Sequence, residues 1–349
     1  MWSALSNAPP VCCLHGSSLS PSSEPFGCSS MAASARIAVV GDVHDDWSLK
    51  EDTRALQFLQ PDLVLFTGDF GNENVELVRS VANLEMAKAV ILGNHDTWTT
   101  KQFSATKKDS VQLQLECLGE EHVGYGRLDF PALKLSIVGG RPFSCGGDQL
   151  FRKKLLTARY GVADMDGSAK RICKAALPKP EDHSVIFLAH NGPTGLGSKI
   201  NDICGRDWVF GGGDHGDPDL ALAISHLKET TNLSIPLVVF GHMHKELAHG
   251  NGLRRMIVVG TDNTIYLNGA IVPRVKMIDE QGTSERCFMN KETPILNPNS
   301  KGTTRAFTLV EILNGRLQRI AETWVSVIGD EATFEEEHIL FKSGTELSP

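Results

Sequence analysis

Val90-Ile91-Leu92-Gly93-Asn94-His95-Asp96 is the stretch of this chain from which its fold can be read most directly. Its apolar residues are typical of a short buried strand. The glycine that follows permits a tight turn, so that an amide, an imidazole and a carboxylate come one after another where the strand ends. On its own, this sequence would also suit an ordinary polar turn.

Four more apolar runs end in the same kind of residue. Each run has the length and the β-branched, leucine or aromatic composition of a strand, and each leads to His, Asp or Asn. The runs with their endings are Ile37–His44, Leu63–Asp69, Val185–Asn191 and Leu237–His244. In open α/β sheets, binding sites form beyond the carboxyl ends of the strands. These endings therefore predict one shared site that is rich in metal ligands.

The composition restricts the class of protein. The chain has 349 residues, of which 41% are hydrophobic and 7% aromatic, and this suits a globular protein with a sizeable core. A net charge of −8 argues against binding to nucleic acid, which depends on neutralising phosphates, but allows a small phosphorylated substrate at bound dications. No apolar run approaches the ~18 residues of a membrane span. The eight cysteines form no Cys-x-x-Cys pair, which indicates reduced thiols of an intracellular protein.

Residues 1–35 differ from the rest of the chain in composition. They contain ten serines, a single acidic residue (Glu24) and no Lys or Arg. Serine-rich, acid-poor leaders resemble plastid transit peptides, although transit peptides are also rich in arginine. We expect a disordered leader and a chloroplast location. The alternative is that translation starts at Met31, which would make the leader an upstream extension and the protein cytoplasmic.

After the first strand, helix and strand signals alternate. Ser48-Leu49-Lys50-Glu51 has the form of a capping box and predicts a helix that ends near Pro61. A second amphipathic helix is expected over residues 74–86, between strands at residues 63–66 and 90–92. Short connections of this kind predict a parallel βαβαβ sheet.

The second half of the chain carries fewer clear signals. Leu133–Val138 alternates like a half-exposed strand, and Asp217-Pro218 suits the N-cap and first residue of a helix. Asn314-Gly315, between two apolar runs, is the strongest hairpin signal. Neither an internal repeat nor a second core is indicated. We therefore expect one domain over residues 36–330 and a frayed tail over residues 331–349.

The strand endings together supply a mixed set of imidazole, carboxylate and amide side chains. Such a set suits Mn, Fe or Zn better than Ca or Mg. It is too large for one ion and large enough for two, and a carboxylate can bridge two ions ~3.5–4 Å apart. The side chains are those of Asp42, His44, Asp69, Asn94, His95, Asp96, His190, His242 and His244.

The order of these motifs resembles the calcineurin-like metallophosphoesterase superfamily: Asp-x-His, Gly-Asp, Gly-Asn-His-Asp, a lone His after a strand, and Gly-His-x-His. The resemblance covers about residues 36–262. It implies an α/β fold, a four-layer sandwich of two mixed β-sheets flanked by α-helices. Ala189–Gly195 and Gly211–Pro218 are similar to a branch of the superfamily shared by cyanobacteria and plants.

Two departures argue against protein phosphatase activity. Phosphoprotein phosphatases of this superfamily carry Asp-Arg-Gly after their Gly-Asp, whereas Asp69 is followed by Phe70-Gly71. Their third motif is Gly-Asn-His-Glu, whereas this one ends in Asp96.

The resemblance also implies a role for each side chain of the set. Two divalent metal ions would share a bridging hydroxide that attacks the phosphorus of a phosphomonoester or phosphodiester. Asp69 would bridge both ions. His95 would protonate the leaving group, while Asp96 would set its tautomer and raise its basicity. The first ion would be held by Asp42, His44 and His244, and the second by Asn94, His190 and His242.

Three further residues are candidates for substrate contact. Arg141 and Arg206 follow glycine-rich or turn sequence and could clamp a phosphate in a bidentate manner, although structural roles are the simpler interpretation. His215 lies in a Gly/Asp-rich loop and could touch substrate, although a turn role is again simpler. The expected function is that of a phosphatase or phosphodiesterase, a metal-dependent phosphoric ester hydrolase acting on a small phosphorylated substrate. The alternative is a non-catalytic scaffold or binding protein of the same fold.

Overall fold

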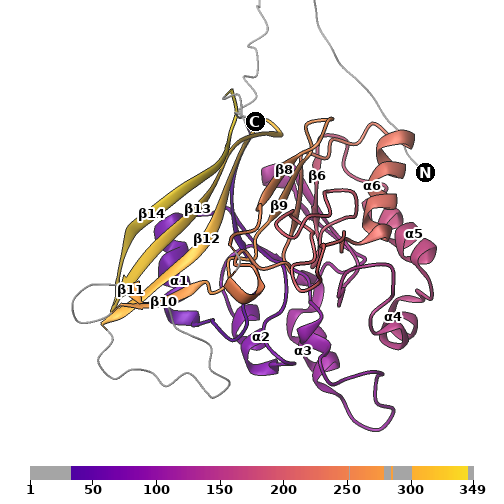
Figure 1. Ribbon diagram of the computed structural model, residues 1–349, viewed down its shortest axis with the longest axis horizontal. Helices are drawn as coiled ribbons and strands as arrows, with labels where there is room; N and C mark the ends of the chain where they lie inside the picture. The colour runs from indigo at the N-terminus through magenta and orange to yellow at the C-terminus, as the bar shows by residue number, and fades with distance from the viewer. Residues whose placement is uncertain (1–32, 251, 279–283, 286–300, 345–349) are drawn as a thin grey trace, which may run out of the picture. The chain divides into compact units, whose positions relative to one another are not determined.

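The structure is a computed structural model that describes residues 33–250, 252–278, 284–285 and 301–344. Most of the expected leader therefore lies outside the described residues, as do the last five residues of the chain. The described part contains two β-sheets, with helices on their outer faces (Figure 1). The predicted fold class is confirmed. Within the described residues, no helix is long and apolar enough to cross a membrane.

The first sheet begins with three parallel strands joined by helical crossovers. This is the predicted βαβαβ unit, although its second helix is shorter than expected. In chain order, the elements are β1 (Ser34–Val40), α1 (Leu49–Leu59), β2 (Leu63–Phe66), α2 (Val75–Ala82) and β3 (Lys88–Val90).

The capping box at the start of α1 is only half formed. The hydroxyl of Ser48 accepts a hydrogen bond from the backbone N–H of Glu51 at 3.4 Å, as a capping box requires. The backbone N–H of Ser48 donates instead to the carboxylate of Asp52, at 2.9 Å. The side chain of Glu51 is paired with Arg305, a residue that is distant in sequence. The predicted end of the helix is confirmed, because Gln60 adopts a left-handed conformation just before Pro61.

The third strand begins earlier than the sequence predicts, at residue 88 rather than residue 90. Its first residue, Lys88, is buried, and its ammonium group donates to the backbone oxygen of Leu84 at 2.9 Å. The same group pairs with Glu121 at 2.8 Å. A lysine in a buried strand interrupts the apolar pattern, so the start of this strand is hidden in the sequence.

The C-terminal part of the chain completes the first sheet. β12 (Gly302–Leu313) lies antiparallel to β1, and β13 (Arg316–Ile328) follows it in a hairpin. Asn314 and Gly315 have φ angles of 51° and 73°, the positive values that a type I′ turn requires. The predicted hairpin is confirmed.

The prediction of a frayed tail is wrong for residues 331–342. These residues form β14 (Glu331–Lys342), which pairs antiparallel with β13. Most of its side chains are exposed, and three consecutive glutamates occupy its centre. A polar edge strand of this kind lacks the alternation from which strands are recognised. Two short strands, β10 (Val275–Ile278) and β11 (Ser284–Glu285), extend the sheet beside β12.

The second sheet is mixed and is covered by helices from the middle of the chain. Its strand order is β4 (Arg127–Phe130), β5 (Leu135–Gly139), β6 (Ser184–Leu188), β7 (Leu237–Phe240), β9 (Ile265–Asn268) and β8 (Ile257–Val259). The remaining α-helices of the described residues are α3 (Ser110–Leu118), α4 (Lys153–Tyr160), α5 (Met165–Ala176) and α6 (Pro218–Thr230). Of these, α3 packs against α2, whereas α5 packs against α6 and β5.

β5 is fully buried, although the sequence predicts a half-exposed strand. It lies between β4 and β6 in the second sheet, so that neither of its edges is free. Ser136 can occupy a buried position because its hydroxyl donates to Asp129 at 2.7 Å. The alternation of polar and apolar residues here includes a buried serine whose hydroxyl is hydrogen-bonded, so it does not indicate that one face of the strand is exposed.

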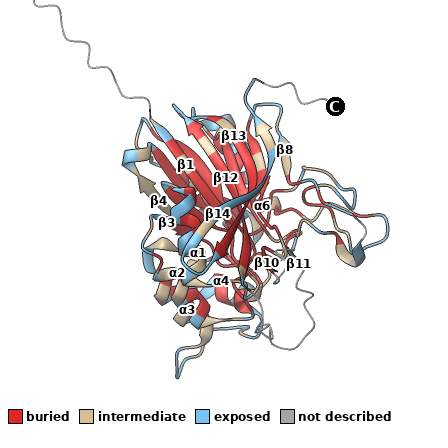
Figure 2. Ribbon diagram, turned by 90° about the vertical axis from the view of Figure 1, so that its left-hand side faces the viewer, coloured by how far each residue is buried: buried red, intermediate tan, exposed pale blue. Residues whose placement is uncertain are grey.

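Alternating side chains of the central strands serve two different cores. In β1, Ile37 and Val39 belong to the cluster between the two sheets, whereas Ala38 and Val40 belong to the cluster beneath the helices. β2, β6 and β7 follow the same rule. Figure 2 shows the resulting concentration of buried residues in the central strands, β1, β12 and β13 among them. Strands buried on both faces read as continuous apolar runs, so the polar residues at their ends stand out in the sequence.

A buried ion-pair cluster joins α1 to the far end of the chain. The carboxylate of Asp52 accepts from Arg274 at 2.7 Å and from Arg305 at 2.6 Å. Arg274 also donates to the backbone oxygen of Asp46, in the loop after β1, at 2.5 Å. All three charged side chains are almost inaccessible to solvent. The cluster therefore holds the first strand ending against the sheet.

We predict that Asp52→Ala lowers the free energy of unfolding by about 3–5 kcal/mol, because it leaves two buried guanidinium groups without their carboxylate. Urea denaturation followed by circular dichroism measures the change. Lys50→Ala on the same helix is the matched control, since Lys50 and Asp330 are 68% and 71% exposed and such pairs contribute less than about 1 kcal/mol. Equal losses in the two variants would contradict the assignment of Asp52 as an anchor.

Candidate metal centre

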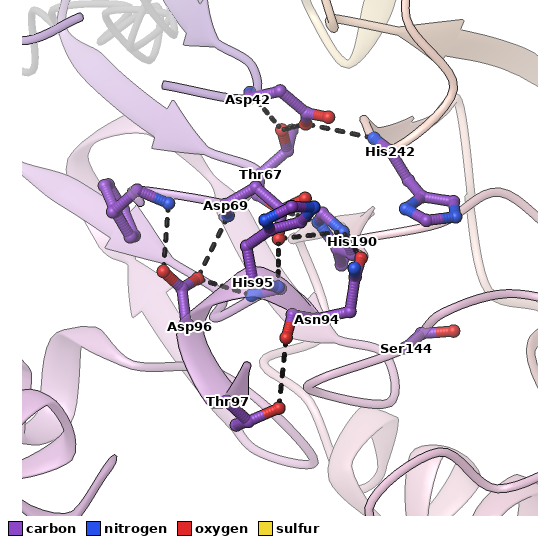
Figure 3. Close-up of polar contacts among 12 residues, drawn as sticks. Asp42, Thr67, Asp69, Asn94, His95, Asp96, Thr97, Ser144, His190 and His242 are labelled. Carbon is purple, nitrogen blue, oxygen red and sulfur yellow. Dashed lines mark hydrogen bonds and ion pairs between the residues drawn. The ribbon is translucent and has the colours of Figure 1, made fainter. Parts of the chain in front are cut away.

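The loops after β1, β2, β3, β6 and β7 meet at one edge of the sheets, and their polar side chains face one another (Figure 3). Two groups of candidate metal ligands lie there, each with its ligand atoms within 4.8 Å of one another. The first group is Asp42, His44 and His244, and the second is Asp69, His190 and His242.

In the first group, two imidazoles and one carboxylate converge. Nε2 of His244 lies 3.0 Å from Nε2 of His44 and 3.5 Å from Oδ2 of Asp42. Oδ1 of Asp42 accepts from the Thr67 hydroxyl at 3.2 Å and from the backbone N–H of His242 at 3.0 Å. Oδ2 of Asp42 is buried and has no hydrogen-bond partner among the described residues. A buried carboxylate oxygen without a donor, beside two imidazole nitrogens, fits a cation ligand.

The second group is built around His190. Its Nδ1 donates to the backbone oxygen of Thr67 at 2.7 Å, and this bond turns Nε2 towards the group. Nε2 of His190 lies 3.3 Å from Oδ1 of Asp69 and 2.9 Å from Oδ1 of Asn94. The ring of His242 meets that of His190 edge-on, with centroids 5.0 Å apart. Asn94 thus lies beside His190 at the edge of this group.

Asp69 belongs to the second group and also faces the first. Its Oδ1 faces His190, and its Oδ2 lies 4.0 Å from Nε2 of His44 in the first group. The backbone N–H of His95 donates to Oδ1 at 2.8 Å and fixes the carboxylate in this orientation. With one oxygen directed to each group, the carboxylate can bridge two ions.

Burial controls the protonation of these side chains. It lowers the pKa of His44 and His242, and lowers that of His244 to about 4, which keeps the imidazoles in the neutral form that binds metals. Burial raises the pKa of Asp42 to about 7. Burial alone would lower the pKa of His190, but the adjacent Asp69 carboxylate raises it to about 10. A cation must therefore displace protons here, so its affinity decreases as the pH falls.

Four of the candidate ligands adopt positive φ angles, a conformation that non-glycine residues rarely adopt. The angles are 38° at Asp42, 43° at His44, 49° at Asp69 and 67° at His242. Each such residue costs about 1–3 kcal/mol and persists only where surrounding contacts enforce it. These residues follow β1, β2 and β7, and their strain indicates that surrounding contacts hold the loops in the conformation that brings the side chains together.

The carboxylate of Asp96 accepts hydrogen bonds from the backbone of two loops and not from His95, the proposed proton donor. Oδ2 accepts from the backbone N–H groups of Gly93 at 2.7 Å and Asp69 at 3.0 Å, and Oδ1 accepts from that of Phe70 at 2.9 Å. These bonds join the turn after β3 to the loop after β2. The predicted role of Asp96 in setting the tautomer of His95 does not match this geometry.

His95 is oriented by Asn72 and Trp98, two residues that the sequence reasoning missed. Nδ1 of His95 lies 2.7 Å from Oδ1 of Asn72. The ring stacks on Trp98, with centroids 4.5 Å apart and planes at 11°, and meets His44 edge-on at 5.0 Å. Asn72 stands three positions after Asp69, in the segment where the chain departs from the Asp-Arg-Gly motif. This departure from the family motif was the sequence feature that could have drawn attention to Asn72.

The prediction that Arg141 could clamp a phosphate is wrong. Its guanidinium is buried and donates to Asp217 at 2.7 Å, to Asp219 at 3.0 Å and to the backbone oxygen of Gln149 at 3.3 Å. Asp217 stands at the N-cap position of α6 as predicted, but its side chain makes no capping bond. The carboxylate accepts from Arg141 and from the Ser144 hydroxyl instead.

Of the other two substrate candidates, His215 lies next to the second ligand group but is not part of it. The ring of His215 stacks over that of His242, with centroids 6.1 Å apart, and its Nε2 donates to the backbone oxygen of Cys145 at 2.8 Å. Arg206 lines the same pocket as His215.

Arg254 is a further residue that the sequence reasoning missed. Its guanidinium donates to the backbone oxygen of His244 at 2.9 Å and to those of Asp202 and Gly205 at 2.8 and 2.7 Å. It also pairs with Asp207 at 3.2 Å. Arg254 thereby fixes the loop of residues 198–213 against a candidate ligand. No motif surrounds this arginine in the sequence, and its role depends wholly on tertiary contacts.

A family model described as calcineurin-like phosphoesterase matches residues 35–246. A comparison with curated proteins found no match. Similar solved structures include a purple acid phosphatase from yellow lupin (Lupinus luteus) seeds, with a TM-score of 0.44 and 14% identity, covering 88% of this chain and 54% of the lupin chain. A dimetal phosphatase from Danio rerio has a TM-score of 0.43 and 11% identity, covering 88% of this chain and 99% of its own. The chain thus spans about half the length of the lupin enzyme.

We predict that His44→Ala removes or strongly weakens one of the two Mn²⁺ sites expected from the two ligand groups, because it deletes an imidazole of the first group. The metal-depleted protein is titrated with Mn²⁺, and the electron paramagnetic resonance signal of the free ion gives the number of Mn²⁺ ions bound per chain. His226→Ala is the control, since His226 is exposed on α6 and outside both groups. A His44→Ala variant that binds Mn²⁺ like the unmodified chain would contradict the assignment.

Proposed function

Because the chain belongs to the calcineurin-like phosphoesterase family, we propose that it hydrolyses a phosphomonoester or phosphodiester of a small molecule with the help of two divalent metal ions. The observation that carries the proposal is the position of Asp69, with one carboxylate oxygen directed to each group of candidate ligands. The full set of donors, including the proposed proton donor, is what a catalytic centre needs. A scaffold would need only part of it.

The spatial grouping of the donors supports an assignment of each side chain to an ion. Imidazole, carboxylate and amide donors together favour Mn, Fe or Zn. Two bound dications would neutralise the phosphoryl oxygens and lower the pKa of a water molecule, so that it can attack near neutral pH. Asp69 serves both ions; the first is assigned to Asp42, His44 and His244, and the second to Asn94, His190 and His242.

His95 supplies the proton for the leaving group. Because Nδ1 faces Asn72, Nε2 is the atom that gives its proton to the leaving oxygen as the bond from phosphorus to that oxygen breaks. Stacking on Trp98 holds the ring plane. His95 lines a pocket of about 290 Å³ together with Asp69 and His242, so the donor and the ligand groups face the same space.

We predict that His95→Ala lowers kcat by about 10²–10⁴-fold, the usual contribution of a general acid. The loss is expected to be larger for phenyl phosphate than for p-nitrophenyl phosphate, because p-nitrophenolate is the better leaving group and needs less protonation. The assay uses the protein loaded in turn with Mn, Fe, Zn or Ni, and includes bis(p-nitrophenyl) phosphate to compare a diester with the monoesters.

Asn72→Ala provides a second arm of the same assay, since it removes only the partner of Nδ1 and should cause a smaller loss than His95→Ala. The proposed role of His95 fails if its removal costs both phenyl esters equally. If no metal supports turnover of any ester above the level of the His95→Ala protein, the chain is a non-catalytic scaffold of this fold.

We also propose a plastid location, on the basis of the serine-rich, acid-poor composition of residues 1–35. A fluorescent protein fused behind these residues is expected to enter chloroplasts when expressed in leaf cells. Retention of the fusion in the cytosol would exclude the proposal.

A further inference from the structure

A pocket of about 910 Å³ lies next to the smaller pocket of the ligand groups. Trp208 lines both pockets. His215 lines the larger pocket, and its ring stacks over that of the candidate ligand His242 with centroids 6.1 Å apart. A molecule whose phosphoryl group lies at the ligand groups can therefore extend past Trp208 into the larger pocket.

One wall of the larger pocket is tied to the proposed proton donor. The wall is the segment Cys145–Arg152. The guanidinium of Arg152 donates to the backbone oxygens of Thr97 at 2.8 Å and Trp98 at 2.6 Å, and Trp98 stacks on His95. The donors of Arg152 are thus used to hold the loop after β3. Arg152 thereby connects this wall of the pocket to Trp98, the residue that stacks on the proposed proton donor.

A second part of the lining is tied to the candidate metal ligands. It includes Arg206 and Trp208, which belong to the loop that Arg254 fastens to the backbone of His244. Trp208 is 51% exposed and meets His215 edge-on, with centroids 5.1 Å apart. Much of its ring surface is therefore available for an apolar or flat group.

Among the described residues that line this pocket, Arg206 is the cationic side chain without a hydrogen-bond partner, since the donors of Arg152 are already used. Within the described part of the chain, its guanidinium has neither a hydrogen-bond nor an ion-pair partner, and its Nε is buried. The guanidinium lies against Gly213, where an added Cβ would come within 2.1 Å of Nη2. A partly buried guanidinium without a partner is unfavourable, and an anion that accepts from its Nη groups would stabilise it.

The acidic residues of the pocket do not neutralise Arg206. The carboxylate of Asp214 accepts from the backbone N–H groups of Gly195 at 2.7 Å and Gly216 at 2.8 Å, and so braces its own loop. Asp148 is exposed and forms no ion pair with Arg206 among the described residues. The positive charge of Arg206 remains available to a ligand.

We propose that this pocket binds a second anionic group of the substrate, a phosphate or a carboxylate, through Arg206. The part of the substrate that joins the two anionic groups packs on Trp208. The inference rests on the proposed function, which places the scissile phosphoryl group at Asp69 and its neighbours. The substrate class is then a small molecule with two anionic groups, such as a bisphosphate or a phosphorylated carboxylic acid.

Two matched pairs of substrates test the inference. Phenyl phosphate and 4-carboxyphenyl phosphate differ by a carboxylate, whereas adenosine 5′-monophosphate and adenosine 3′,5′-bisphosphate differ by a phosphate. The measured quantity is the ratio of kcat/KM for the doubly anionic member to that for the singly anionic member. We expect the unmodified chain to favour the doubly anionic member of at least one pair, and the pair concerned identifies the second anion.

Arg206→Gln is expected to lower that ratio by about 10–100-fold, the loss that follows removal of a charge-assisted hydrogen bond. Arg206→Lys keeps the charge but not the fork and should give an intermediate ratio. Arg255→Gln is the matched control, because Arg255 carries the same charge close to this loop but is 61% exposed and does not line the pocket. Its ratio should equal that of the unmodified chain.

Calorimetric binding of adenosine 3′,5′-bisphosphate and adenosine 5′-monophosphate separates this inference from the proposed function. In a chain that hydrolyses neither pair, Arg206-dependent preference for the bisphosphate supports the pocket while the proposed function fails. In an active chain, a ratio that Arg206→Gln does not change overturns the pocket and leaves the proposed function intact. Absence of both activity and Arg206-dependent binding overturns both.

Discussion

Two carboxylates, Asp42 and Asp69, are buried together at the meeting point of the strand endings, and the rest of the structure is arranged around them. Burial of like charges is unfavourable unless positive charge is supplied. Burial also keeps the nearby imidazoles of His44, His242 and His244 in the neutral form, so these histidines do not supply that charge. Without a metal ion, protonated His190, whose pKa is raised beside Asp69, supplies part of it. Bound cations would displace the proton of His190 and supply the positive charge in its place.

Contacts far from the ligands offset the free-energy cost of burying these charges and of the strained backbone. Strands buried on both faces stabilise the two sheets, and their ends can then carry residues in strained backbone conformations. Asp96 joins two ligand loops through backbone N–H groups, and Arg254 fastens a third loop to His244. The resulting site joins a small pocket with the proton donor to a larger one with an unpaired arginine.

The sequence allowed prediction of features that are local and repeated. The apolar runs located the central strands, and the polar residues after them included both groups of candidate ligands. The hairpin at Asn314-Gly315 was visible because a turn type depends on two adjacent residues. The tasks of Asn72, Arg141 and Arg254 were not visible, because each depends on a partner brought close only by the fold. β14 was missed since an exposed edge strand has no apolar pattern.

The most direct test of the account is a crystal structure of the Mn²⁺-loaded protein, with the anomalous signal of manganese used to locate the ions. The account predicts two anomalous peaks with Asp69 between them, one beside Asp42, His44 and His244 and the other beside Asn94, His190 and His242. A single peak, or peaks that do not contact Asp69, would contradict it.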